Sequence, residues 1–248
     1  MRLWIEHPVE PRELILAWQA PDGVEDRRRW AVGALSKVDG EVTFRYFSAA
    51  EFREKNAGRA VDLLRDHGFA GYPAFRFEPG KVYSQSILET FERRLPPPTR
   101  SDFPSYLEYF SIRPGKAVSL FTLLGLTEAR LPGDGFSLVD PLDPNTGTGE
   151  VTFEIAGYRH EAADVVPDLG ALLTLVADPT NVWDSRAIAV YLGDVKLGFV
   201  NRIQAPAVGG WLEDRKLECR LLRFNGRRGA PRAYAILRID PEGKQLAA

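Results

Sequence analysis

Short apolar runs separated by turn-forming residues follow one another along the first part of the chain. Three of these runs are rich in β-forming residues and predict strands over residues 14–19, 30–35 and 42–47. Asp39 and Gly40 lie between the second and third runs, and an Asp-Gly pair favours a tight hairpin turn. The pattern therefore predicts a small antiparallel β-meander.

Apolar residues then recur at helical spacing. The period predicts a helix over residues 49–67, which Gly68 would end. Further helices are expected over residues 86–95, 101–110 and 117–126, and a last strand over residues 136–139. Residues 69–77 form an aromatic, extended stretch whose rings are expected to pack in a core, with a partner-binding edge as the alternative.

In the rest of the chain, short apolar runs alternate with turns at regular spacing. They predict a helix over residues 201–211 and strands over residues 150–158, 171–176, 187–192, 195–200, 217–224 and 233–239. Gly198 lies inside one of these strands, which indicates a bulge or a close backbone approach. Six short strands with regular turns favour a small barrel over an open sheet.

A run of turn formers with two Asp-Pro pairs, residues 140–149, is the clearest linker in the chain. We therefore predict an α+β protein with two domains. Residues 1–140 would form the meander with its helices, residues 141–149 the linker, residues 150–242 a small β-barrel, and residues 243–248 a tail.

Composition and charge narrow the possible functions. The chain has 248 residues, of which 44% are hydrophobic and 27% charged, as in ordinary soluble globular proteins. Its formal net charge of −2 gives no overall field that would attract nucleic acid or a membrane, so such a site must be local. No apolar segment approaches the ~18 residues of a membrane-spanning helix. Acidic residues and prolines interrupt the first 13 residues, MRLWIEHPVEPRE, where a signal peptide would have a continuous apolar segment. We therefore expect a cytoplasmic protein.

Candidate catalytic chemistry is sparse. The single cysteine, Cys219, excludes an intrachain disulfide framework and a multi-cysteine zinc site, and its alternating surroundings favour a buried position. We find no ligand-spaced set of His, Cys and Asp and no nucleophile beside an obvious base, so we expect no metal, no cofactor and no enzymatic activity. The enzymatic alternative is a metal-dependent nuclease that uses Asp178 and Asp184.

The most informative stretch is the polar loop within residues 178–190, DPTNVWDSRAIAV. Turn formers surround a single indole, Trp183, which lies between Asn181 and Asp184. An aromatic side chain in such a loop either caps the core or is presented to a ligand. Turn formation alone would have Asn181 and Asp184 satisfy backbone amides and Trp183 cover the barrel.

Three sequence blocks, IAGYRH, LTLVADPTNVWDSRAIAVY and KLGFVNR, together resemble the HIRAN domain over about residues 150–240. The resemblance implies an OB-like barrel that binds DNA, in the best-understood members the 3′ end of a single strand. Carried over by motif, it points to Arg159, His160, Asn181, Trp183 and Asp184. His160 departs from the family, which often has an aromatic such as tyrosine at that position.

These residue types suit single-strand binding, which needs aromatic faces for bases and cations for phosphates. Trp183, with Tyr158 or His160, would supply the faces, and the guanidinium of Arg159 would bind phosphate. Asn181 would hold the loop or contact a base edge. Asp184 would accept a hydrogen bond from a terminal hydroxyl.

Residues 14–140 carry a second resemblance. A meander with VGAL and DGEVTFRY, a helix with FERRLPP and a helix ending in LLGL are similar to the N-terminal subdomain of the HipA family of toxin kinases. The resemblance implies that this part contacts another protein. We find no Gly-rich phosphate loop and no HRD-type catalytic run, so no kinase core is expected. The alternative is an unrelated small α+β domain.

Basic residues gather near the end of the chain. Residues 150–248 hold 13 basic and 13 acidic residues, yet six arginines fall within residues 220–238, where there is no acid: Arg220, Arg223, Arg227, Arg228, Arg232 and Arg238. This stretch is either a solvated hairpin face or a track for phosphates, for which Arg223, Arg227 and Arg228 are the candidates.

These observations lead to one hypothesis and one alternative. We predict a non-enzymatic DNA-binding protein that recognises single-stranded DNA or a 3′ DNA end through residues 150–242, with residues 1–140 contacting a partner protein. The alternative is a protein-interaction module that binds no nucleic acid, which the net charge of −2 favours.

Overall fold

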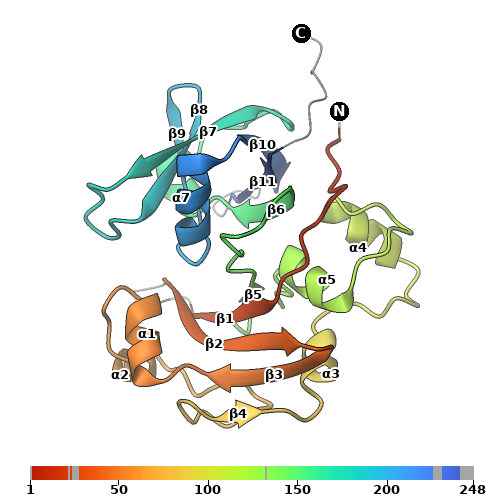
Figure 1. Cartoon of the computed structure of the whole chain (residues 1–248), viewed down its shortest axis with the longest axis vertical. Helices are drawn as coiled ribbons and strands as arrows, with labels where there is room; N and C mark the ends of the chain where they lie inside the picture. The colour runs from red at the N-terminus through yellow and green to blue at the C-terminus, as the bar shows by residue number, and fades with distance from the viewer. Residues whose placement is uncertain (1, 22, 24–27, 132, 226–230, 241–248) are drawn as a thin grey trace. The chain divides into compact units, whose positions relative to one another are not determined.

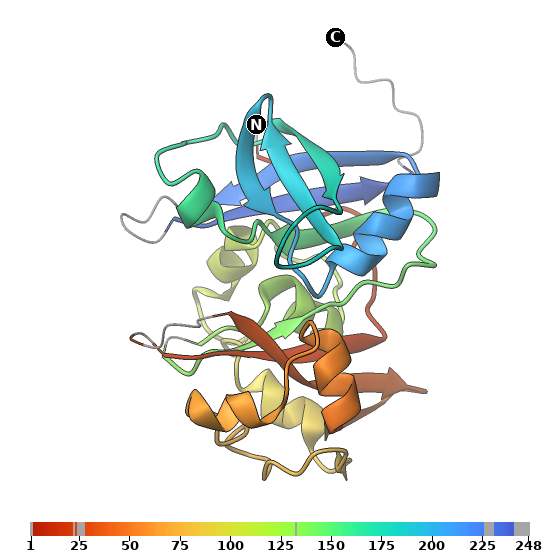
Figure 2. The ribbon, with the colours of Figure 1, turned by 90° about the vertical axis from the view of Figure 1, so that its left-hand side faces the viewer.

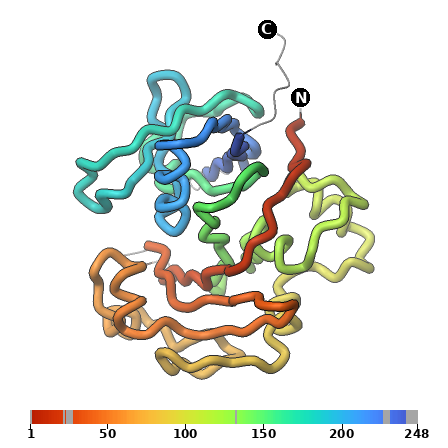
Figure 3. The backbone as a smooth tube through the Cα atoms, viewed as in Figure 1, coloured from red at the N-terminus to blue at the C-terminus, as the bar shows by residue number. Residues whose placement is uncertain are grey.

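The structure, a computed structural model, describes residues 2–21, 23, 28–131, 133–225 and 231–240. The chain forms two compact units, each discontinuous in sequence. A C-terminal unit combines residues 1–9, 101–117 and 142–248, and a middle unit combines residues 10–100 and 118–141. Figures 1 and 3 let the reader follow the chain through both units. The independent domains expected on either side of residues 141–149 stay a prediction.

The middle unit is built on an antiparallel sheet with the strand order β4-β3-β2-β1-β5. The predicted meander is confirmed: β1 (Glu13–Gln19), β2 (Arg29–Val38) and β3 (Glu41–Tyr46) pair consecutively. Asp39 and Gly40 both have positive φ at the turn, as a tight hairpin requires. The edge strands are β4 (Val82–Tyr83) and β5 (Phe136–Val139).

Helices α1 (Ala49–Lys55), α2 (Asp62–Asp66), α3 (Ile87–Glu92) and α5 (Leu120–Thr127) complete this unit. The single helix expected over residues 49–67 is wrong, because the chain leaves the helical conformation after α1. The amide side chain of Asn56 bonds both the N–H and the C=O of Ala31, and Ala57 and Gly58 take positive φ. A long-range bond to β2 thus ends the helix.

The aromatic stretch of residues 69–77 packs in the core of the middle unit, as expected. The rings of Tyr72 and Phe75 are buried, and both residues bond the hydroxyl of Tyr46 through their backbone. Burial raises the pKa of Tyr46 to about 12. These rings therefore offer no partner-binding edge.

The C-terminal unit contains a six-stranded antiparallel sheet with the order β6-β11-β10-β7-β8-β9. Its strands are β6 (Gly149–Glu154), β7 (Leu172–Asp178), β8 (Ala187–Leu192), β9 (Val195–Phe199), β10 (Leu217–Phe224) and β11 (Ala233–Ile239). Helix α7 (Ala205–Asp214) buries Val208 and Trp211 in the core beneath the sheet, and Figure 2 shows it beside the strands. Cys219 is buried in the same core, as predicted.

The sheet is not closed into a barrel, so the expected barrel is wrong in this respect. Among the described residues, β6 and β9 share no ladder, and the two edges meet only at an isolated bridge between Ala156 and Phe199. Gly198 permits this approach: a Cβ built on it would lie 2.3 Å from the carbonyl oxygen of Ala156. The close backbone approach predicted from Gly198 is therefore confirmed.

The strand expected over residues 150–158 ends earlier, at Glu154. The reason is Gly157, whose φ of 78° turns the chain into the short helix α6 (Tyr158–Glu161). The other strands predicted in this unit are confirmed to within two residues at each end. In the described ranges, no helix is long and apolar enough to span a bilayer.

Two segments from the first half of the chain pack in the C-terminal unit. Residues 2–9 pair with β6 through a parallel bridge between Pro8 and Glu150, and the carboxylate of Glu150 accepts hydrogen bonds from the N–H groups of Glu6 and His7. Helix α4 (Phe103–Tyr109) and the residues after it form the second segment. The N–H of Ile5 donates to the carbonyl of Ser111 at 2.9 Å, which joins the two segments.

Candidate functional site

The loop between β7 and β8 is held by its own polar side chains. The carboxylate of Asp178, at the end of β7, accepts bonds from the hydroxyl of Thr180 at 2.9 Å and from the amide of Asn181 at 3.3 Å. The Oδ1 of Asn181 in turn accepts the backbone N–H groups of Trp183 and Asp184 at 3.0 and 3.3 Å. Asn181 therefore stabilises the turn by accepting its backbone N–H groups, as expected if it acts as a turn-forming residue.

Asp184 anchors the far side of this loop. Its Oδ1 accepts the backbone N–H of Arg186 at 3.0 Å, and its Oδ2 forms an ion pair with the Nε of Arg202 at 2.9 Å. Arg202 also donates from Nη2 to the carbonyl of Trp183 at 3.2 Å. Both carboxylate oxygens are thus engaged in positioning the loop.

The tip of the loop presents two apolar side chains to solvent. Val182 is 88% exposed and Trp183 is 70% exposed. Trp183 is therefore no cover for the core, although its backbone is fixed on both sides by Asn181 and Arg202. Figure 1 shows the loop extending from the ends of β7 and β8. The loop therefore presents an exposed indole on a backbone that hydrogen bonds already fix.

Two arginines that were not predicted as site residues lie near Trp183. Arg186 lies in the loop itself, and its side chain is 52% exposed and 3.8 Å from the carboxylate of Asp184. Arg202 follows β9 and is 26% exposed. The quoted blocks contain both residues, but pairing Arg202 with Asp184 depends on β8 and β9 lying side by side.

The residues predicted after β6 divide into buried and exposed ones. Tyr158 is buried: its hydroxyl donates to the carbonyl of Val165, and its ring lies 5.7 Å from that of Phe224. Burial raises the pKa of this phenol, and the ring offers no face to a base. Arg159 and His160 are exposed, and the Nε of Arg159 donates to the Nε2 of His160 at 2.9 Å.

Helix α6 contacts β9, and the β7–β8 loop contacts Arg202, which follows β9. Glu161 of α6 forms an ion pair with Lys196 of β9 at 2.9 Å, and Ala156, before α6, bridges Phe199. Arg202, which follows β9, donates to the carboxylate of Asp184 and to the carbonyl of Trp183 in the loop. The sheet thus brings the Arg159 and Trp183 segments to the same strand, although 24 positions separate them in sequence.

Most described members of the C-terminal arginine stretch form ion pairs with carboxylates of their own or a neighbouring strand. Arg220 and Arg238 both bind Glu218, at 3.0 and 2.8 Å, and Arg238 also binds Glu150 at 2.8 Å. Arg232 lies 3.7 Å from Glu154. Arg227 and Arg228 lie outside the described residues.

Arg223 differs from these arginines, because its guanidinium lies against three aromatic rings instead of a carboxylate. Two of these rings, Tyr109 and Phe110, belong to α4 and the residue after it. Residues 101–110 were predicted to belong to the other domain, so the contact of Arg223 with Tyr109 and Phe110 could not be expected from the sequence.

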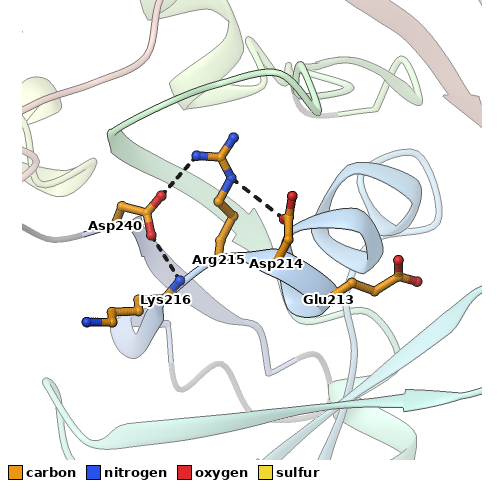
Figure 4. A pocket seen from close by; sticks show the side chains of 5 residues that line it. All are labelled: Glu213, Asp214, Arg215, Lys216 and Asp240. Atoms are coloured by element: carbon orange, nitrogen blue, oxygen red, sulfur yellow. Dashed lines mark hydrogen bonds and ion pairs between the residues drawn. The ribbon is translucent and has the colours of Figure 1, made fainter.

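A shallow polar hollow beside the end of α7 is lined by Glu213, Asp214, Arg215, Lys216 and Asp240 (Figure 4). The backbone N–H of Lys216 donates to Asp240 at 2.9 Å, and the guanidinium of Arg215 donates to it at 3.0 Å. These bonds lower the pKa of Asp240. Through Asp240 these bonds hold the residues just before β10 to the end of β11.

The described residues contain no group of three or more His, Cys, Asp and Glu side chains that could hold a metal ion. What the loop and α6 do offer is an exposed indole, an exposed imidazole and guanidinium groups. This set can stack on planar groups and bind anions.

No family model and no curated protein matches this sequence. Two solved structures are similar to part of it. The HIRAN domain of human HLTF is 19% identical with a TM-score of 0.32, and the match covers 38% of this chain and 78% of that chain. A protein from Lactobacillus plantarum is 21% identical with a TM-score of 0.31, covering 38% and 99%. Scores this low carry no argument about function, and the HipA resemblance of residues 14–140 stays a prediction.

Proposed function

We propose that this protein binds single-stranded DNA without catalysis, through the β7–β8 loop and α6, and that it prefers a strand with a free 3′ end. The observation that carries the proposal is Trp183, an indole that is 70% exposed on a loop whose backbone is already held by hydrogen bonds. An exposed indole is left available for stacking.

The energetics of stacking favour such a loop. One base stacked on an aromatic side chain contributes about 1–3 kcal/mol. Ordering a flexible loop on binding would offset part of this gain, and a loop that is fixed beforehand avoids that cost. The bonds from Asn181, Asp184 and Arg202 therefore raise the affinity that Trp183 can supply.

Phosphate contacts are assigned to two exposed arginines. Arg186 adjoins Trp183, and Arg159 lies on α6, where His160 provides a second ring in place of the buried Tyr158. The planar guanidinium group matches phosphate oxygens better than an ammonium group does. Local cations supply the attraction that a net charge of −2 does not.

The test is fluorescence anisotropy of the full chain with three labelled DNAs: a single strand with a free 3′-hydroxyl, the same strand with a blocked 3′ end, and a blunt duplex. We expect the free single strand to bind most tightly and the blocked end to bind more weakly. Equal binding of the free and blocked strands would contradict the proposed preference for a free 3′ end.

Variants then locate the site. The double variant Trp183→Ala with Arg159→Ala should lose most of the affinity, because it removes a stacking face and a phosphate contact. Val182→Ala is the matched control, since Val182 is the more exposed neighbour but has no ring to stack. Unchanged binding by the folded double variant would refute the proposal.

The second candidate is a protein-docking loop, and the observation that favours it is the 88% exposure of Val182 beside Trp183. Salt separates the two, because phosphate contacts release counterions and weaken steeply with salt, whereas apolar docking does not. Binding a protein partner through the middle unit is a further part of the proposal. Its test is recovery of the same partner by the full chain and by the Trp183→Ala variant.

A further inference from the structure

One face of the C-terminal sheet carries a cluster formed by Arg223, Tyr234, Tyr109 and Phe110. Arg223 on β10 pairs across the strands with Tyr234 on β11, and its guanidinium carbon lies 3.7 Å from the centroid of that ring. The rings of Tyr109 and Phe110 lie 4.5 and 4.6 Å from the same carbon. Residues more than 100 positions apart thus surround one cation.

This cation has no counter-charge among the described residues. Arg220 on β10, Arg238 on β11 and Arg232 just before β11 each have a carboxylate partner, whereas Arg223 forms no ion pair in the described part of the chain. Its Nε is buried and has no hydrogen-bond acceptor there. A buried donor without a partner is unfavourable, so the described contacts do not satisfy this guanidinium group.

The three rings do not meet this need. Aromatic faces attract the charge of a guanidinium group, but its five N–H donors still require oxygen or nitrogen acceptors. The rings hold the planar group in place, and its Nη groups, which unlike Nε are not buried without a partner, can donate to an external anion. Phosphate oxygens match this fork of donors.

We propose that Arg223 is a second subsite, which binds a backbone phosphate of single-stranded nucleic acid while the ring of Tyr109 stacks on an adjoining base. This inference rests on the proposed function and extends it to another surface of the same unit. Tyr109 is 49% exposed, so its ring is accessible although it contacts Arg223. Phe224, the neighbour of Arg223, contacts the ring of Tyr158, the residue that precedes Arg159. The cluster therefore lies at the end of the sheet where α6 begins.

The test measures the affinity of the full chain for a labelled thymidine strand between about 50 and 200 mM salt, where each phosphate contact contributes about 0.7 to the logarithmic salt slope of a single strand. Arg223→Gln should lower that slope by about 0.7. Arg220→Gln is the matched control on the same strand. Arg220 already forms an ion pair with Glu218, so the salt slope of this variant should equal that of the wild type. Tyr109→Ala should weaken binding about 5- to 150-fold and leave the slope unchanged.

The outcomes separate the two proposals. If Arg223→Gln and Tyr109→Ala bind like the wild type while Trp183→Ala loses affinity, the subsite is wrong and the proposed function stands. If the wild type binds no strand at any salt, both are wrong. Should Arg223→Gln melt early, Tyr109→Ala decides, because its ring is 49% exposed, and wild-type affinity in that folded variant would overturn the subsite.

Discussion

Glu150 offers a direct test of how the C-terminal unit is assembled. Its side chain is nearly buried, and its carboxylate accepts the N–H groups of Glu6 and His7 and the guanidinium of Arg238 at 2.8 Å. The substitution Glu150→Gln keeps the size of the side chain and removes its charge. The new amide would direct an N–H donor toward a group that is itself a donor.

The expected loss follows from these contacts. Hydrogen bonds to a charged group contribute about 1.5–3 kcal/mol each, and their contributions are not additive within one cluster. Glutamine keeps one acceptor oxygen, and Arg238 keeps its bond to Glu218 at 2.8 Å. We therefore expect the free energy of unfolding of the C-terminal unit to fall by about 3 kcal/mol.

Urea unfolding of the full chain, followed by thiol labelling of its single cysteine, Cys219, which is buried in the core of this unit, measures this loss. Glu161→Gln is the control: its ion pair with Lys196 is about one-third exposed on both sides, so its removal should cost at most about 1 kcal/mol. A loss of less than about 1 kcal/mol in Glu150→Gln would refute the view that residues 2–9 are bound to the sheet through this carboxylate.

Three further predictions concern other sites. Gly198→Ala should destabilise the C-terminal unit by about 1–3 kcal/mol in urea unfolding, because its Cβ would meet the carbonyl of Ala156 at 2.3 Å; wild-type stability would contradict this. Hydrogen bonds from Arg45 lower the pKa of Glu51 from 4.5 to about 2, so Glu51 stabilises the fold above pH 4.5 and loses this effect as the pH falls toward 2. Glu51→Gln should therefore melt below the wild type at neutral pH and together with it near pH 2; a constant difference would exclude the ion pair as the cause. Burial raises the pKa of Cys219 to about 12, and a thiol reagent at mild alkaline pH should modify it only after denaturation.

Local patterns predicted most of the strands. The alternation in residues 217–224 and 233–239 matches β10 and β11 at both ends, and the Asp39-Gly40 pair marks the hairpin between β2 and β3. These signals lie within a few residues of the feature that they predict. The end of α1 shows the limit, because Asn56 ends this helix by bonding Ala31, a residue on another element.

The candidate site divides in the same way. Turn residues such as Trp183 and Asn181 could be identified from their own loop, since the turn chemistry is local. The burial of Tyr158 and the roles of Arg202 and Arg223 could not, because each depends on a strand or helix that is distant in sequence. Charge counting also failed for Arg238, whose carboxylate partners Glu150 and Glu218 lie on the two neighbouring strands.

The discontinuity of the two units has a consequence for the order in which they form during synthesis. All segments of the middle unit have been made once residue 141 leaves the ribosome, so that unit can fold first. The C-terminal unit must wait for β11, because β6 pairs with β11 and not with its neighbours in sequence. Residues 2–9 are made before the other segments of this unit, and Glu150, which they bond, is translated more than 140 residues later. Such distant pairings are slow to form, and residues 2–9 stay without this partner until Glu150 has been made.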